Sequence, residues 1–545
     1  MAERSSYWGG QRMNRKTVLL ICLMACAVFC ILYGPGKLNP GYTDWLLTNP
    51  DSVTQYIGVQ AFRQSKWMFP LGNLNTIHYP DTSSIIFTDS IPLLAIIYKL
   101  LLPLFSGNYQ FIGIWVLLCY ILTGLISGKI LSRFIKNEVT LLIGVAIILL
   151  NPVLAYRYFG HASLMGQWTI LLAAIPLTYY SQWPSGSRKM LGFSCFLGFL
   201  TPSIHMYFFL EAGVVLFTYC LYDALTKKKF IAEIGNLALY CLSGAITIFL
   251  LGGFSGTRKL WGGAGGFGEY SFNLNGFLNA QGYSTIFNGL TCGEKQYEGF
   301  SYLGIGIILL LLTVVISAFT LEKNGTWIRN KRNLIITFVV FAFISVLIST
   351  SPVVMLGDHV LFKIPFPRII QRIWGVFRST GRLIWPLYYF LYFAGIILIE
   401  KYIKRKKLIP VILFACLILQ VVDLYPLFSG KKVSDGIVYQ SGLDEETWTE
   451  LVQETGTEHL VLMGMSTDSQ YEFGIFAINH GLTLNTFRMA HGELPYLERA
   501  EKSIKNKEKG YLYIFSDENE SEKYSELKSF KMDSYWLGLP VEDPN

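Results

Sequence analysis

The sequence predicts a polytopic α-helical membrane protein with a small α/β domain at its C-terminal end. Of its 545 residues, 52% are hydrophobic and only 15% are charged, whereas soluble domains carry roughly 25% charged residues. Uncharged apolar runs recur along the chain, and a run of about 18 residues can cross a hydrocarbon core of about 30 Å. Charged residues are also unevenly distributed between the two parts of the chain. From Lys431 onward there are 11 Lys and Arg against 21 Asp and Glu, a net of −10, while the remainder has a net of +18.

The first apolar run, residues 17–33, follows a basic N-terminal segment and is predicted to be a retained membrane span. It ends in Tyr33-Gly34-Pro35-Gly36 instead of the small-residue motif after which a signal peptide is cleaved. Because Lys and Arg are retained on the cytoplasmic side, residues 1–16 are predicted to be a cytoplasmic N-terminus. The chain then emerges on the extracytoplasmic side near Gly34.

The Lys and Arg content of the later loops indicates how many times the chain crosses the membrane. Residues 91–105 are interrupted by Pro92, Lys99 and Pro103, so we interpret this run as re-entrant or interfacial. With that choice, basic turns alternate with turns poor in Lys and Arg, and about 11 transmembrane helices fill a domain at residues 17–429. The predicted outer segments are residues 37–110, 158–163, 203–205, 252–299 and 351–382. A full crossing by residues 91–105 would invert every later loop.

The outer segment 351–382 departs from this charge rule. Its basic residues alternate with Ile, Phe and Trp, which predicts an amphipathic helix in the membrane interface. The five basic residues are Lys363, Arg368, Arg372, Arg378 and Arg382. Two anionic partners fit them, lipid headgroups or a substrate phosphate, because Arg binds phosphate through two parallel hydrogen bonds.

Residues 430–545 are predicted to be a separate extracytoplasmic α/β domain. Short β-rich runs at 460–463 and 511–515 alternate with charged helical stretches at 444–452 and 493–505. The domain has neither a glycine-rich phosphate loop nor a nucleophile elbow. We therefore expect it to contact an acceptor or shield a site, not to carry out catalysis.

The first outer loop carries three carboxylates that could act as a general base beside the membrane: Asp44, Asp51 and Asp89. Asn49-Pro50-Asp51 is a helix-start signal, and the helix is predicted to run through Ser65. Structural explanations exist as well. Asp51 could simply stabilise a helix N-terminus, and Asp89 could be the N-cap of a segment that opens at Pro92.

Several motifs in this loop occur together: Asp51-xxx-Gln55-Tyr56, Phe62-Arg63, Trp67-xx-Pro70-Leu71-Gly72 and Thr88-Asp89-Ser90-Ile91-Pro92. Together they closely resemble the first loop of GT-C superfamily membrane glycosyltransferases, in particular a group of largely uncharacterised bacterial GT-C-like proteins. Further matching stretches are residues 161–168, 269–271, 297–304 and 377–382. The resemblance covers most of residues 15–430 and the tail less securely.

The resemblance implies a GT-C-like fold with interfacial helices in the first outer loop. It also implies an inverting hexosyl- or pentosyltransferase of the bacterial plasma membrane. The donor would be a polyprenyl-phosphate sugar, and the acceptor an extracytoplasmic envelope glycan, glycopolymer or lipid. By motif position Asp51 would be the base and Asp44 the runner-up, with Arg63, Arg378 and Arg382 holding the departing lipid phosphate. No metal or cofactor is required, although a lone carboxylate could recruit Mg²⁺.

Six further polar residues complete the predicted substrate-binding set. They are Gln55, His161, His205, Glu211, Glu269 and Glu298. Glu211 is the only carboxylate well inside a predicted span, one to two turns below His205. Intramembrane carboxylates are functional by default, and the alternative is a satisfied interhelical bond. For His161 and His205 the alternative is interfacial hydrogen bonding.

Two other functions fit the sequence. A transporter or flippase of lipid-linked glycans should carry several ionisable residues at mid-membrane, and a non-enzymatic envelope assembly factor would use the outer domain to bind partners. A nucleic-acid partner is disfavoured because the basic residues sit at span ends. Eight of the nine cysteines lie in apolar spans and no CxxC pair occurs, so neither a disulfide framework nor a zinc site is supported.

Overall fold

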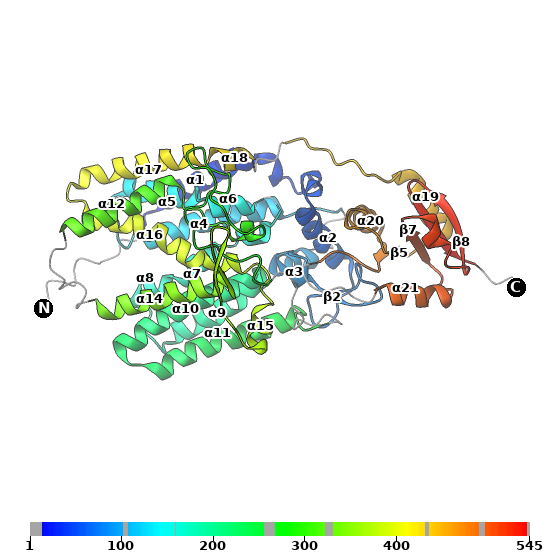
Figure 1. Cartoon of the computed structure of the whole chain (residues 1–545), viewed down its shortest axis with the longest axis horizontal. Coiled ribbons are helices and arrows are strands. Elements are labelled where there is room, and N and C mark those ends of the chain that lie inside the picture. Colours follow the sequence, from blue (N-terminus) through cyan, green and yellow to red (C-terminus); the bar gives the residue numbers. More distant parts are fainter. Residues whose placement is uncertain are drawn as a thin grey trace. The chain divides into compact units, whose positions relative to one another are not determined.

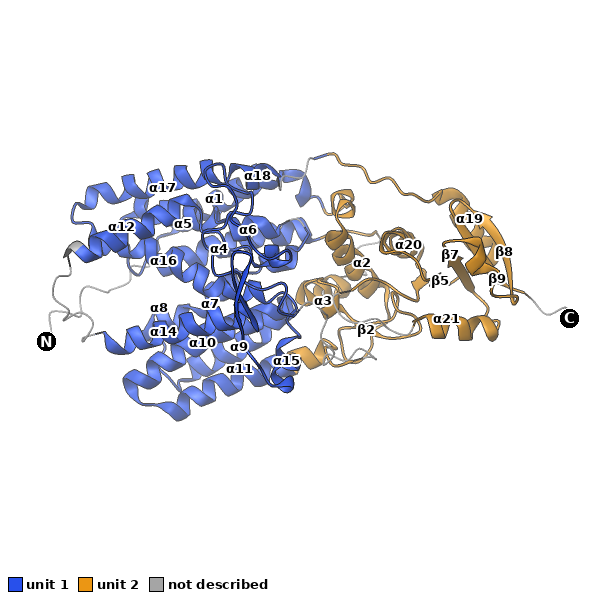
Figure 2. Cartoon of the chain, viewed as in Figure 1, with its two compact units in different colours: residues 1–39, 111–245, 265–435 blue, residues 40–110, 246–264, 436–545 orange. Residues whose placement is uncertain are grey.

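The computed structural model of the chain describes residues 13–101, 107–158, 160–255, 267–321, 331–430, 435–489 and 496–541 (Figure 1). Contacts divide the chain into two compact units, each assembled from segments that are far apart in the sequence (Figure 2). Unit 1 comprises residues 1–39, 111–245 and 265–435, and unit 2 comprises residues 40–110, 246–264 and 436–545.

Unit 1 is a body of roughly parallel helices (Figure 1). Its helices are α1 (Arg15–Tyr33), α4 (Ile112–Leu131), α5 (Glu138–Leu149), α6 (Pro152–Arg157), α7 (Trp168–Ala173), α8 (Ile175–Thr178), α9 (Arg188–Ile204), α10 (Met206–Lys227), α11 (Phe230–Leu250, whose last turn belongs to unit 2), α12 (Ile305–Leu321), α14 (Arg332–Thr350), α15 (Arg368–Trp374), α16 (Trp385–Tyr402), α17 (Ile409–Asp423) and α18 (Tyr425–Gly430).

Within the described ranges, seven helical stretches are long and apolar enough to cross a membrane. They are Arg15–Tyr33, Ile112–Leu131, Glu138–Arg157, Met206–Lys227, Phe230–Leu250, Arg332–Thr350 and Thr380–Tyr402. The stretches Ala162–Thr178 and Ile305–Phe319 are apolar but shorter. Long apolar helices are consistent with a membrane protein, while the count of about 11 spans stays a prediction.

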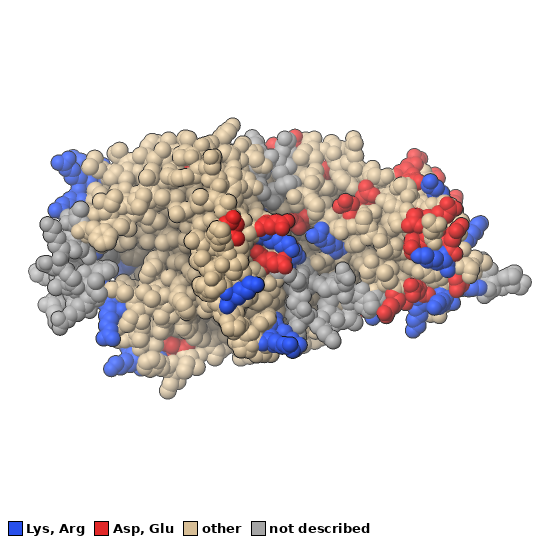
Figure 3. Space-filling model, in the orientation of Figure 1, with Lys and Arg blue, Asp and Glu red and all other residues tan. Residues whose placement is uncertain are grey.

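The surface of unit 1 suits a lipid environment. Large apolar side chains are exposed on its helices, among them Leu19 on α1, Ile231 on α11 and Phe319 on α12. On the face shown in Figure 3, charged residues cluster towards the ends of the helical body and uncharged residues cover most of its length. Exposed apolar side chains of this kind gain free energy when lipid replaces water around them.

Contacts inside unit 1 test the predicted alternation of inner and outer turns. Thr17 Oγ1 donates to Glu138 Oε1 at 2.6 Å, and Asn333 Nδ2 donates to the Leu225 carbonyl at 3.0 Å. Thr17 begins the first predicted span, and Glu138, Leu225 and Asn333 adjoin the basic turns near residues 129–136, 227–229 and 323–332. The charge alternation predicts that all of these span ends are on the cytoplasmic side. The predicted outer turns also meet one another, and they form the site described below.

The segment 351–382 forms more structure than its sequence suggested. Two residues after α14 it forms an antiparallel hairpin of β3 (Val353–Leu356) and β4 (His359–Lys363), and every residue of β4 is exposed. The predicted amphipathic helix is present as α15, which buries none of its seven residues. Apolar and basic side chains are therefore both exposed directly beyond the end of a membrane-length helix.

Unit 2 combines the first loop with the tail. The loop contains η3 (Asp44–Thr48), α2 (Pro50–Gln64), β1 (Asn73–Leu74), β2 (Ser83–Ser84) and α3 (Pro92–Leu100). The tail contains α19 (Glu445–Thr455), β5 (His459–Met463), α20 (Thr467–His480), β6 (Thr483–Leu484), α21 (Tyr496–Lys505), β7 (Tyr511–Phe515), α22 (Glu518–Ser521), β8 (Leu527–Met532) and β9 (Tyr535–Pro540).

The tail is a small domain with one mixed sheet, as predicted. The strand order is β6-β5-β7-β9-β8. Strand β5 pairs in parallel with β6 and β7, whereas β9 pairs antiparallel with β7 and β8. Both predicted β-rich runs lie on the central strands β5 and β7, because fully buried strands are continuous apolar stretches.

Helix α3 does not cross a membrane by itself. It has nine residues, or about 14 Å at 1.5 Å per residue. The chain before and after it is joined directly, since the Gln110 N–H donates to the Pro40 carbonyl at 2.8 Å and Arg63 donates to the Gly107 carbonyl at 2.6 Å. The two ends of the first loop are therefore close together, which is consistent with the re-entrant or interfacial interpretation of residues 91–105; residues 102–106 lie outside the described part of the chain.

The first loop and the tail are also tied together. The Tyr79 N–H donates to the Leu484 carbonyl and the Leu484 N–H to the Thr76 carbonyl, each at 2.7 Å. The loop after α11 joins them through a bond of 2.5 Å from Ser84 Oγ to the Leu251 carbonyl. Three segments predicted to be extracytoplasmic thus form one folded unit.

Candidate functional site

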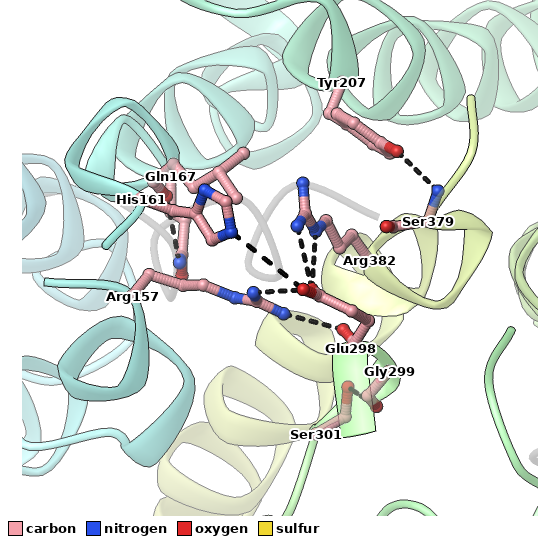
Figure 4. A network of polar contacts seen from close by, with 10 residues as sticks. Arg157, His161, Gln167, Tyr207, Glu298, Gly299, Ser301, Ser379 and Arg382 are labelled. Atoms are coloured by element: carbon pink, nitrogen blue, oxygen red, sulfur yellow. Dashed lines mark hydrogen bonds and ion pairs between the residues drawn. The ribbon is translucent and has the colours of Figure 1, made fainter. Parts of the chain in front are cut away.

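The centre of the candidate site is the buried carboxylate of Glu298, in the short turn η9 (Gln296–Gly299) of unit 1 (Figure 4). Its Oε2 accepts hydrogen bonds from Arg157 Nη1 at 2.7 Å and from Arg382 Nε and Nη2 at 3.1 and 2.8 Å. Arg157 Nη2 also donates to the Glu298 carbonyl at 2.6 Å. Burial alone would raise the pKa of Glu298, but Arg382, Arg157 and His161 together lower it well below its usual range.

The cluster is assembled from several predicted outer segments. Arg157 is the last residue of α6, a short helix that begins at Pro152 and has Asn151 as its N-cap. His161 follows in the next turn, with its Nε2 3.9 Å from Glu298 Oε1. Arg382 comes from η10 (Thr380–Ile384). His161, Glu298 and Arg382, each from a segment predicted to be extracytoplasmic, therefore meet at one end of the helical body.

Close backbone contact brings Arg382 to Glu298. A Cβ added to Gly381 would lie 2.6 Å from the Gly299 Cα, and one added to Gly299 would lie 2.8 Å from the Ser271 carbonyl oxygen. Only glycine allows the two turns to approach this closely. A neighbouring bond from the Ser379 N–H to Tyr207 Oη at 2.7 Å fixes the same segment to the start of α10.

Glu211 lies on α10 and its side chain is fully buried. Neither carboxylate oxygen has a hydrogen-bond partner in the part of the chain that the structure describes. The charges of Arg382 and Arg157 act on it. The structural alternative, a satisfied interhelical bond, is therefore not observed among the described residues, and Glu211 becomes a fifth ionisable member of the cluster, beside Arg157, His161, Glu298 and Arg382.

Arg378 is the more accessible arginine beside the cluster. It is half-buried, its Nη2 donates to Tyr270 Oη at 2.9 Å, and its guanidinium lies 4.6 Å from the centre of the Tyr270 ring. By contrast, Arg382 is buried and two of its nitrogens bind Glu298. Of the two arginines predicted together for phosphate contact, Arg378 is the one whose position allows direct contact.

Two other predicted residues of unit 1 have simple structural roles. Glu269 pairs with Lys295 at 2.6 Å on the surface. His205 ends α9 and begins α10, where its Nδ1 accepts the Tyr207 N–H at 3.3 Å. His205 thus acts as the hydrogen-bonding helix cap that was the alternative to a catalytic role.

Asp51 lies in the first turn of α2 in unit 2 and is exposed. The Asn49 side chain accepts the Asp51 N–H at 3.0 Å, so the predicted helix start is confirmed. The predicted end is also confirmed within one residue, because Ser65 is the C-cap. A carboxylate in the first turn of a helix interacts favourably with the helix dipole.

The other two carboxylates of the first loop are placed differently. Asp44 accepts the Tyr439 N–H at 3.1 Å, a bond that holds the start of the tail. Asp89 adopts a positive φ of 60°, and its carbonyl accepts Gln55 Nε2 at 2.8 Å. The interpretation of Asp89 as an N-cap is wrong: the N-cap of α3 is Ile91, which makes no side-chain cap bond.

Arg63 was predicted to hold the lipid phosphate, and the structure gives it another task. Its side chain is buried, and Nη1 donates to the Gly107 carbonyl at 2.6 Å and to Gln60 Oε1 at 3.2 Å. Its guanidinium also lies 5.1 Å from the centre of the Tyr98 ring. Arg63 therefore closes the first loop around α3, and its contact with a lipid phosphate stays a prediction.

Sequence reasoning missed Arg157, which is as central to the cluster as Arg382. A signal was present. Arg157 is a basic residue immediately before an outer turn, and the same breach of the positive-inside rule had drawn attention to Arg378 and Arg382.

Within the described ranges, no group of three or more His, Cys, Asp or Glu side chains could hold a metal ion.

Comparison with known families assigns most of the chain to one family. A family model described as Domain of unknown function (DUF6311) matches residues 22–425, and the DUF6311 C-terminal domain matches residues 447–540. The chain belongs to the DUF6311 family. No curated protein matches its sequence. The larger DUF6311 match includes the charge cluster and the candidate bases Asp44, Asp51 and Asp89. The smaller match begins within α19 and extends to the end of β9.

Proposed function

We propose that this protein is a membrane glycosyltransferase that moves a sugar from a polyprenyl-phosphate donor to an extracytoplasmic acceptor of the bacterial envelope. The observation that carries the proposal is the buried cluster of Arg157, Glu298 and Arg382 at one end of an apolar helical body. A lipid phosphate is an anion held at the depth where membrane helices end. Arginines fixed in a low-dielectric site bind such an anion without reorganisation.

The cluster suits a leaving lipid phosphate. Glu298 neutralises one of the two buried arginines and fixes the direction of both. Arg378 is half-buried beside them and would contact the phosphate oxygens directly. As the bond between the anomeric carbon and the phosphate oxygen breaks, the electron pair goes to the phosphate, and these arginines would stabilise the charge that develops there.

The acceptor hydroxyl would attack the anomeric carbon from the opposite face and invert its configuration. Its proton must pass to a base, and Asp51 is our first candidate, with Asp44 and Asp89 behind it. The exposed position of Asp51 at the start of α2 supports this order. Asp44 already accepts a bond that holds the tail, and Asp89 lies on strained backbone.

The contacts within unit 2 support an extracytoplasmic site. The first loop, the loop after α11 and the tail fold together, so they share one side of the membrane. With the basic N-terminal segment in the cytoplasm, that side is extracytoplasmic. The same assignment places the Glu298 cluster at the outer end of the helices.

A second candidate is a transporter or flippase of lipid-linked glycans, and one observation favours it. Glu211 is buried on a membrane-length helix without a hydrogen-bond partner among the described residues. Nearby helices are interrupted, since α5 stops before α6 and α9 contains Pro202. Buried carboxylates and broken helices are typical of coupled transporters.

Purified protein in liposomes can test the proposal. Labelled polyprenyl-phosphate sugars would be offered together with envelope glycans, and sugar transfer would be followed separately from movement of the lipid across the bilayer. We expect transfer, and we expect Arg378→Ala to weaken donor binding by about 10- to 100-fold. Arg372→Ala, which changes an exposed arginine of the same segment, should bind the donor normally. Lipid movement without transfer would instead establish the flippase.

A further inference from the structure

Unit 2 contains a cleft whose lining includes none of Asp44, Asp51 and Asp89. Its volume is about 370 Å³, within the size range of small-molecule sites. The first loop contributes residues 79–81, and the tail contributes side chains from β5, β7, α21 and the segment after β6. Two parts of the chain that are about 400 residues apart thus form one concave surface.

The lining combines aromatic rings with balanced charges. Tyr79, Tyr496 and Tyr511 supply the rings. Asp81 and Arg499 form an ion pair across the cleft, from the first loop to α21.

Two further charged residues of opposite sign, Lys502 and Glu508, also line the cleft. The formal charges therefore sum to zero, so the cleft has no net attraction for an anion such as a phosphate. It does offer both donors and acceptors of hydrogen bonds, including Ser503 and Asn506.

The aromatic side of the cleft is held in place. The Tyr79 ring stacks on His459 with centroids 4.0 Å apart and planes 11° apart, and Tyr511 packs against the same imidazole at 4.7 Å. The backbone of Tyr79 is fixed by its bond to Leu484. Rings fixed in this way provide apolar contact area at low cost in conformational entropy.

We infer that this cleft binds an uncharged carbohydrate, the glycan acceptor of the transfer reaction. Sugar rings have apolar C–H faces that pack on tyrosines and rims of hydroxyls that both donate and accept hydrogen bonds. A neutral cleft with tyrosines, an Asp–Arg pair, Ser503 and Asn506 matches both features. The acceptor role rests on the proposed function, whereas carbohydrate binding itself does not.

Binding can be measured on the full-length protein in lipid nanodiscs. An array of neutral, phosphorylated and sulfated oligosaccharides would be screened, and the affinities of bound glycans measured by calorimetry. We expect selective binding of neutral oligosaccharides. Tyr496→Ala and Arg499→Gln should each weaken it by about tenfold, the effect of losing one ring contact or one polar contact. Lys505→Gln, on the same helix but outside the cleft, should bind like the wild type.

Three results would overturn the inference: no binding of neutral glycans, a preference for the anionic ones, or wild-type affinity in both cleft variants at unchanged melting temperature. Other results would refute the proposed transferase function without refuting the carbohydrate site. Neutral glycan binding that depends on the cleft, without any transfer, would refute the transferase and leave the carbohydrate site standing. Transfer that is insensitive to both cleft variants would leave the transferase standing and refute the acceptor role of the cleft.

Discussion

The charge cluster of unit 1 and the carboxylates of the first loop in unit 2 represent two different ways of placing ionisable groups. In the cluster, Glu298 is buried and hydrogen-bonded to two arginines, so each buried charge is stabilised by a neighbouring charge of opposite sign. Asp51 is exposed in the first turn of its helix. Groups of the first kind are revealed by three-dimensional contacts, whereas those of the second kind can be recognised from a short motif.

This contrast predicts that Asp51 matters for chemistry and little for folding. Asp51→Asn keeps the size of the side chain but cannot take a proton at neutral pH. We expect transfer to fall by about 10²- to 10⁴-fold, the usual contribution of a general base, while the melting temperature hardly changes. Steady-state transfer rates in liposomes and thermal unfolding in detergent measure the two effects.

Asp44→Asn and Asp89→Asn are the matched controls, since each removes a carboxylate of the same loop. Full activity in Asp51→Asn together with loss in Asp44→Asn would move the base to Asp44. If all three variants remain active, the mechanism proposed here is wrong.

Glu298 should show the opposite pattern, with a large effect on folding. Glu298→Gln leaves two buried guanidinium groups without a counter-charge, and removing one partner of a buried ion pair costs about 3–5 kcal/mol. We expect a clearly lower melting temperature or reduced yield of folded protein. Glu269→Gln breaks a solvent-exposed pair and should unfold like the wild type. Equal stability of the two variants would show that the cluster does not hold the outer turns together.

The pH dependence of stability should follow from the same bonds. The two arginines lower the pKa of Glu298 in the folded protein, so its contribution is complete above the pKa of an unfolded Glu, about 4.3, and is lost as the pH falls further. The difference in melting temperature between wild type and Glu298→Gln should therefore shrink as the pH is lowered from 7 towards 3. A difference that stays constant would mean that the ionised carboxylate is not what stabilises the fold.

Glu211 gives the smallest expected effect, and it separates the two candidate functions. Glu211→Gln keeps the shape of the side chain and removes its ability to ionise. A transferase in which Glu211 only adjusts the cluster should lose less than about fivefold in rate. A transporter that couples movement to protonation of Glu211 should lose coupled transport altogether.

Much of the fold followed from the sequence because its signals are local. Helix α2 was predicted from a single Asn-Pro-Asp step, and strands β5 and β7 from short apolar runs. The interpretation of residues 91–105 is supported by bonds on either side of α3. The β3–β4 hairpin was missed, because its exposed apolar residues resemble the rest of an interfacial segment.

The candidate site was only partly predictable. Glu298 was chosen as a motif residue, Arg382 from both its motif and the charge of its segment, and Arg157 was not chosen at all. The sequence could not pair them, because the bonded residues are 141 and 84 positions apart. No periodicity relates such positions. Arg63 proved to be buried within the first loop, which a motif match could not show. Its bonds to Gly107 and Gln60 became visible only in the folded loop.

A structure of the full-length protein in nanodiscs with a bound polyprenyl phosphate would test the central claim most directly. We predict phosphate oxygens within hydrogen-bond distance of the Arg378 guanidinium, beside an intact bond between Arg382 and Glu298. A phosphate held only by the exposed Arg368 and Arg372 of α15, with Arg378 still on Tyr270, would contradict the claim. In that case the outer arginines would serve to anchor lipid headgroups, and the cluster would be a structural feature of the helical body.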